Sequence, residues 1–91
     1  MTLAPGTRVL ITGGAAGIGR AMADAFAGAG ARVWIADADD AALADAPAGW
    51  GRTRCDVADR ASVDALFDAV HAVWGGLDVL CANAGTAGPT A

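Results

Sequence analysis

The 91-residue sequence contains no tyrosine, no lysine and no glutamate. Its ten acidic residues are therefore all aspartate, and its six basic residues are all arginine. A single histidine, His71, falls on a helical segment away from any strand end, where an exposed helix residue is expected rather than a catalytic base. Proton transfer by a tyrosine or lysine side chain is consequently excluded from these residues.

Cysteine and basic charge are scarce as well. Cys55 and Cys81 lie far apart, with no C-x-x-C spacing and no accompanying histidines, so we expect two buried, reduced thiols and no metal site. The net charge of −4 argues against binding to nucleic acid or to an anionic membrane surface. No apolar run approaches the roughly 18 residues of a membrane span. No secretion signal is visible either, so we expect a cytoplasmic protein.

Hydrophobic residues make up 55% of the chain, whose 91 residues suit one small domain. Short apolar runs alternate with amphipathic segments. We expect strands at 8–12, 32–36, 50–57 and 77–82, and helices at 17–27, at 38–46 and from 59 or 60 to 74. This alternation predicts an α/β fold, a Rossmann-like parallel sheet of strand order 3-2-1-4. The first two helices should cover one face and the third the other, which is the first half of a doubly wound fold.

Two helices should each bury an apolar stripe. In the helix at 17–27, Ile18, Met22 and Phe26 recur at helical spacing. In the last helix the stripe consists of Val63, Leu66, Phe67, Val70 and Trp74. The last strand has no further strand to pair with, so we expect an uncovered face or edge beside either Val79 and Cys81 or Leu80 and Ala82.

A glycine-rich stretch follows the first predicted strand and runs into the first predicted helix. Its glycines allow a sharp turn and a close approach of a bulky anion to the main chain. The helix N-terminus adds unpaired N–H groups and a partial positive charge. In a strand–turn–helix setting the usual anion is a dinucleotide pyrophosphate. The residues predicted to hold it are Gly13, Ala16, Gly17, Ile18 and Gly19, whereas Thr12 is expected to be structural.

Four stretches together resemble the short-chain dehydrogenase/reductase family. Thr12 to Gly19 gives the pattern T-G-x-x-x-G-x-G, and an aspartate, Asp37, ends the second strand. Asp56-Val57 after the third strand looks like the adenine-contacting pair of the family. Asn83-Ala84-Gly85 after the fourth resembles the end of its N-N-A-G motif, with Ala82 in place of the first asparagine. The resemblance implies that these residues contact a nicotinamide dinucleotide.

Asp37 bears on the choice of cofactor. A carboxylate there can accept hydrogen bonds from both hydroxyls of the adenine-side ribose. It would repel the 2′-phosphate of NADP, and no compensating arginine is expected beside it because Ala38 follows and Gly14 occupies the turn. The sequence therefore favours NAD. An N-cap or turn role for Asp37, and a turn role for Asp56, remain the alternatives.

The resemblance implies hydride transfer between the nicotinamide and an alcohol or ketone substrate in the complete enzyme. It also implies that the complete enzyme can form a homo-oligomer. Family members move the proton with a tyrosine supported by a lysine and a serine. Tyrosine and lysine are absent here, and the only serine, Ser62, lies near the start of the last helix. No catalytic residue can be assigned, so the 91 residues alone should be inactive. We expect the chain to be the N-terminal, NAD-binding part of a longer enzyme. A stand-alone nucleotide-binding module and a fragment completed by another chain are the alternatives.

Overall fold

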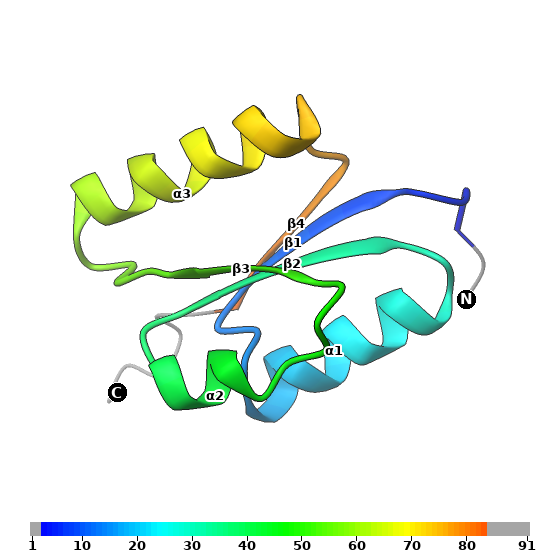
Figure 1. The fold of residues 1–91 in the computed structure, drawn as a ribbon, viewed down its shortest axis with the longest axis horizontal. Helices are drawn as coiled ribbons and strands as arrows, with labels where there is room; N and C mark the ends of the chain where they lie inside the picture. Colours follow the sequence, from blue (N-terminus) through cyan, green and yellow to red (C-terminus); the bar gives the residue numbers. More distant parts are fainter. Residues whose placement is uncertain (1–2, 84–91) are drawn as a thin grey trace.

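The computed structural model describes residues 3–83. In this part of the chain, strands and helices alternate as β1 (Arg8–Thr12), α1 (Gly17–Gly28), β2 (Arg32–Asp37), α2 (Asp40–Ala44), β3 (Gly51–Arg54), α3 (Arg60–Trp74) and β4 (Val79–Ala82) (Figure 1). Every pairing is parallel, and the strand order is β3-β2-β1-β4. The predicted α/β fold and the order 3-2-1-4 are therefore confirmed.

The second helix is shorter than predicted, covering Asp40–Ala44 instead of 38–46. Its start is set by Asp39, whose carboxylate accepts a hydrogen bond from the Ala42 amide at 3.1 Å. A side chain that caps a helix in this way sits outside it, in extended backbone. The residues before Asp39 therefore belong to the turn that follows β2.

The third strand also ends earlier than predicted, at Arg54 rather than at residue 57. Beyond it the Cys55 amide still donates to the Asp37 carbonyl at 3.0 Å. The chain then bends at Asp56, whose carboxylate accepts from the Ala58 amide at 2.9 Å. This local bond of an aspartate with the backbone two residues on competes with strand pairing.

The sheet separates two apolar layers, as expected from the period of two along a strand. Alternate residues of β1 and β2 point toward α1 and α2, and the residues between them point toward α3. The first layer holds Val9, Ile11, Val33 and Ile35 together with Ala23 and Leu43. The second holds Leu10, Trp34 and Ala36 together with Leu66 and Val70. Figure 1 shows α1 and α2 on one side of the sheet and α3 on the other, as predicted.

The predicted apolar stripes are only partly correct. Met22 and Phe26 pack into the core beneath α1, but Ile18 is 75% exposed at the start of that helix. On α3, Leu66 is fully buried whereas Phe67 is 39% exposed. Helix α3 packs on β1 and β2, and β4 lies beyond β1 at the sheet edge.

The last strand, β4, is uncovered on the face of the sheet that is turned toward α3. Leu80 is 48% exposed there, and Ala82 is exposed too. Val79 and Cys81 instead pack against the core beneath α1 and α2. Of the two pairs left open by the sequence, Leu80 and Ala82 are therefore the uncovered one.

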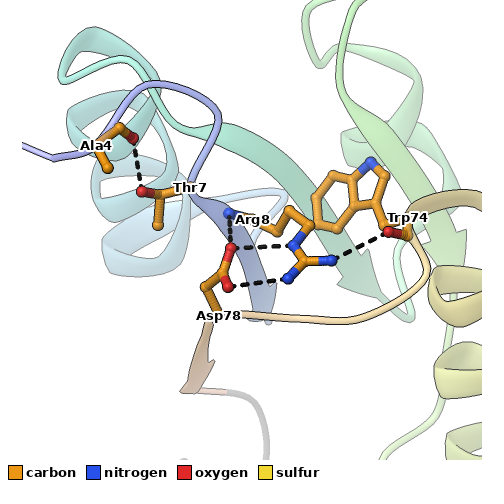
Figure 2. A network of polar contacts seen from close by, with 5 residues as sticks. All are labelled: Ala4, Thr7, Arg8, Trp74 and Asp78. Carbon is orange, nitrogen blue, oxygen red and sulfur yellow. Dashed lines mark hydrogen bonds and ion pairs between the residues drawn. The ribbon is translucent and has the colours of Figure 1, made fainter.

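An ion pair joins three elements at the amino edge of the sheet, where Arg8 begins β1 and Asp78 precedes β4 (Figure 2). The Arg8 guanidinium donates twice to the Asp78 carboxylate, from Nε and Nη2, each at 3.0 Å. The Arg8 backbone amide donates to the same carboxylate at 2.8 Å, and Nη1 donates to the Trp74 carbonyl at 3.1 Å. The bidentate contact thus ties β1 to β4 and to the end of α3.

These bonds predict a specific loss of stability in acid. The hydrogen bonds from Arg8 lower the pKa of Asp78 to about 2 from an ordinary value of 3.8. Because the folded protein holds this carboxylate ionised, its contribution to stability is present above pH 4 and is lost as the pH falls from about 4 to about 2. We expect Asp78→Asn to lower the melting temperature at pH 7 and to flatten its decline over that range.

The matched control is Asp64→Asn, since Asp64 pairs with Arg60 on the exposed face of α3 at 3.6 Å. Exposed pairs of this kind contribute little to stability. The melting temperature at pH 7 should therefore stay close to that of the unsubstituted protein. Equal losses in the two variants would contradict a special role for the Arg8–Asp78 pair.

Candidate functional site

The predicted site residues that the structure describes lie at the carboxyl edge of the sheet, where the ends of β1, β2 and β4 meet. The turn after β1 is held against β2, because the amides of Gly13 and Gly14 both donate to the Ala36 carbonyl, at 2.7 and 3.3 Å. Gly13 has a φ of 65° and Gly17 a φ of 60°, backbone conformations that favour glycine. The turn therefore has the sharp course that the sequence predicts.

Two of the glycines are also required by close packing. A Cβ on Gly19 would lie 1.9 Å from the Gly13 carbonyl oxygen, and a Cβ on Gly14 would lie 2.7 Å from a methyl group of Ile35. Gly17 differs, because nothing lies within 4 Å of the position its Cβ would take. Gly17 thus leaves open space above the turn, whereas Gly19 permits the helix to pack against the turn.

The N-terminus of α1 has no side-chain cap. Its N-cap residue, Ala16, offers no hydrogen-bonding side chain, and the first turn contains no acidic residue. By contrast, α2 and α3 are capped by the carboxylates of Asp39 and Asp59. The amides at the start of α1 therefore have no capping side chain, and the Cβ position of Gly17, the first residue of the helix, faces open space. This arrangement fits the pyrophosphate of a dinucleotide.

Asp37 ends β2 beside the glycine turn. Its carboxylate accepts a hydrogen bond from the Ala15 amide at 3.2 Å through Oδ2 and one from the Asp39 amide at 3.0 Å through Oδ1. Asp39 rather than Asp37 caps α2, so the N-cap alternative for Asp37 is wrong, whereas the bond from the Asp39 amide shows that the turn role left open by the sequence is present. Each carboxylate oxygen retains acceptor capacity beyond these bonds, which suits it to ribose hydroxyls.

Asn83 follows β4 and joins it to the turn. Its side-chain amide donates to the Gly13 carbonyl at 3.3 Å, and its backbone amide donates to Thr12 Oγ1 at 3.0 Å. Thr12 is 8% exposed and donates in turn to the Cys81 carbonyl at 3.4 Å. Thr12 is structural, as predicted, since it joins β1 to β4, and Asn83 lies beside the glycine turn. Ala84 and Gly85 lie outside the described residues.

Asp56 and Val57 lie in the turn after β3, at the same edge of the sheet. Both are exposed. The Asp56 carboxylate supports the turn through Ala58, and its backbone amide donates to Ser62 Oγ at 3.0 Å. The turn role that the sequence left open for Asp56 is therefore present. The sequence assigned Ser62 to no site, but its hydroxyl fixes this turn. The only sequence signal for such a role is its position three residues after Asp59, the N-cap of α3.

The expectation that no arginine lies beside Asp37 is wrong in three dimensions. Arg54, the last residue of β3, is the register partner of Asp37 across the parallel pairing of β2 and β3. Its Nε lies 3.4 Å from a carboxylate oxygen of Asp40, the first residue of α2. Chain neighbours gave no sign of this arrangement, and only the register of the two strands could have revealed it.

The histidine and two of the tryptophans lie away from this edge of the sheet. His71 is exposed on α3, and Trp34 and Trp74 pack edge to face with ring centroids 5.3 Å apart. Within residues 3–83, no group of three or more histidine, cysteine or aspartate side chains is placed to hold a metal ion. In the same part of the chain, no helix has both the length and the apolar character needed to cross a membrane.

The sequence matches the family model of the short chain dehydrogenases over residues 7–91. It is 50% identical over 90 residues to cis-4-hydroxycyclohexanecarboxylate dehydrogenase of Sinomonas cyclohexanicum, covering 90% of this chain and 35% of that protein. It is 45% identical over 89 residues to D-threitol dehydrogenase of Mycolicibacterium smegmatis, covering 90% of this chain and 34% of that protein. The chain thus spans about one third of the length of these relatives.

Solved structures agree with the sequence comparison. L-Sorbose reductase from Gluconobacter frateurii, complexed with NADPH and L-sorbose, superposes with a TM-score of 0.83 at 32% identity, covering 94% of this chain and 36% of that one. A 3-ketoacyl-(acyl-carrier-protein) reductase from Brucella melitensis, complexed with NADH, gives a TM-score of 0.77 at 34% identity, covering 84% and 33%. Fold, glycine turn and family model agree, and the chain belongs to the short-chain dehydrogenase family of oxidoreductases.

Proposed function

We propose that this chain binds NAD and forms the cofactor-binding part of a dehydrogenase acting on an alcohol or ketone. The observation that carries the proposal is the 3.2 Å hydrogen bond from the Ala15 amide to the Asp37 carboxylate. It joins the glycine turn, which suits a pyrophosphate, to the carboxylate, which suits the ribose next to it. Two groups that one dinucleotide would contact are thereby held in a fixed relation before the ligand arrives.

The preference for NAD rests on the charge of Asp37. The 2′-phosphate of NADP carries about −1.5 to −2 charges if it titrates as other phosphate monoesters do. At about 4 Å from a carboxylate and an effective dielectric constant of 20, each unit charge costs on the order of 4 kcal/mol. Solvent reduces this cost greatly, but about 1.4 kcal/mol already corresponds to a tenfold ratio of affinities.

The chain's own residues would bind and orient the cofactor. The amides at the start of α1 and the open space over Gly17 would receive the pyrophosphate, and Asp37 the adenine-side ribose. Asp56 and Val57 would contact the adenine, while Ile18 and the segment Asn83 to Gly85 would line the remainder of the site. The nicotinamide, when bound, supplies hydride exchange with the substrate carbon.

Proton transfer is not assigned to these residues, because the sequence has neither tyrosine nor lysine. We therefore propose that the 91 residues bind the dinucleotide and do not oxidise or reduce a substrate by themselves. Cys55 and Cys81 are free thiols, of which Cys55 is buried as expected and Cys81 is only partly buried. They suit a reducing compartment, so we place the protein in the cytoplasm.

The proposal predicts that Gly17→Val weakens binding of NAD at least tenfold, as measured by isothermal titration calorimetry. The valine side chain would project into the space above the turn, where the pyrophosphate is expected. The helix content, followed by circular dichroism, should change little because nothing contacts a Cβ at this position. Retained affinity would contradict the pyrophosphate assignment.

The matched control is Gly30→Val. Gly30 has a φ of 97° and open space around its Cβ position, so the valine meets a similar backbone strain there. Gly30 lies before β2, at the opposite edge of the sheet. Its substitution should lower stability as Gly17→Val does but leave the affinity for NAD within twofold. An equal loss of affinity in both variants would attribute the effect to strain alone.

A further inference from the structure

Arg54 and Asp37 lie next to each other on the same face of the sheet. They are register partners in the parallel pairing of β3 with β2, and such partners project to one side. That side is the one covered by α2, because the guanidinium of Arg54 reaches Asp40 at the start of that helix. Neighbouring strands are about 4.8 Å apart, so Arg54 stands one strand away from the carboxylate proposed to bind the ribose.

The ion pair that holds Arg54 is weak. The Nε···Oδ2 distance is 3.4 Å, and the two side chains are 63% and 75% exposed for Arg54 and Asp40. Pairs exposed to this extent contribute little to stability. The guanidinium can therefore leave Asp40 at little cost if a stronger anion is placed within its reach.

A phosphate on the 2′-oxygen of the ribose would be such an anion. Arginine binds phosphate through a planar fork of donors, more strongly than it binds an exposed carboxylate in a single contact. Asp37 repels this phosphate, whereas Arg54 attracts it from the adjacent strand. Asp40 opposes Arg54, because it neutralises the guanidinium and holds it over α2.

We propose that Arg54 is a cofactor-selecting residue and that Asp40 sets its strength. The inference rests on the proposed binding of a dinucleotide with its ribose at Asp37. It adds Arg54 on β3 to Asp37 on β2 as a residue that determines the choice between NAD and NADP. In the unsubstituted protein Asp40 competes with the 2′-phosphate for Arg54, and the repulsion from Asp37 keeps NAD preferred. Without Asp40, Arg54 is available to the 2′-phosphate of NADP, and the ratio of the affinity for NAD to that for NADP becomes smaller.

The test is to measure, by calorimetry on the full-length protein, the dissociation constants for NAD⁺ and NADP⁺. We expect Asp40→Ala to improve the affinity for NADP⁺ relative to NAD⁺ by about threefold to fivefold. The same substitution made in an Arg54→Ala background should change this ratio less than twofold. The effect in Asp40→Ala should also shrink on going from low to high salt, since the groups are exposed.

The control for net charge is Asp64→Ala, which removes one exposed carboxylate from α3 on the other face of the sheet. The ratio of affinities should not respond to it. An unchanged ratio in Asp40→Ala, or an equal shift with and without Arg54, would overturn the role of Arg54 while leaving NAD binding intact. If the unsubstituted protein bound neither dinucleotide, the proposed function itself would fail, and this inference with it.

Discussion

The Gly19→Ala variant is expected to lose about 3 kcal/mol of unfolding free energy and, with it, the binding of a dinucleotide. The added methyl would lie 1.9 Å from the Gly13 carbonyl oxygen and 2.8 Å from Asn83 Nδ2. The Gly13 carbonyl belongs to the turn itself and Asn83, which follows β4, is bonded to it, so α1 or the turn must shift. Overpacking of this kind costs roughly 1–3 kcal/mol, and losing the bond from Asn83 to Gly13 adds about 1 kcal/mol. Urea denaturation followed by circular dichroism measures the loss.

Gly28→Ala provides the control within the same helix. Gly28 is the last residue of α1, and nothing lies within 4 Å of its Cβ position. Alanine is favoured over glycine in a helix by up to about 1 kcal/mol, so this variant should be unchanged or slightly more stable. The same chemical change thus has opposite expected effects at two positions. Similar losses at both would show that the contact with Gly13 is not what requires glycine at position 19.

The topology could be predicted from the sequence because each element has a strong local signal. The runs at β1 and β2 are apolar and bounded by glycine or aspartate, and α3 carries a long apolar stripe. Parallel connections of this length allow few arrangements, and the strand order follows from them. Gly13 and Asp37 could be placed for the same reason, since each lies at the end of a strand whose end was clear, and Gly17 could be placed because it begins the helix that follows.

What could not be predicted depends on contacts between segments distant in the chain. The place of Arg54 beside Asp37 depends on the register of β2 with β3, and a shift of one residue would have moved Arg54 to the other face. The exposure of Ile18 and Phe67 depends on how each helix is rotated over the sheet. Helical spacing shows which residues share a face, but it does not show which of them the sheet reaches.

The adjacent residues Leu66 and Phe67 of α3 turn this difference into the second large prediction. Leu66 is fully buried against β1 and β2 in the layer that contains Leu10 and Trp34, whereas Phe67 is 39% exposed. Truncating a fully buried leucine to alanine costs about 2–5 kcal/mol, partly because of the cavity that it leaves. We therefore expect Leu66→Ala to lower the melting temperature by roughly 10–25 °C for a chain of this size.

Phe67→Ala removes a larger side chain from the same helix and should cost about 1–2 kcal/mol, less than Leu66→Ala, since Phe67 is already 39% exposed. The comparison separates hydrophobicity from burial: a stripe read from sequence alone ranks phenylalanine above leucine, and the structure reverses that order. Thermal unfolding of the two variants decides between them. A greater loss in Phe67→Ala would mean that α3 is rotated relative to the sheet, with Phe67 directed at β1 and β4 and Leu80 covered by it.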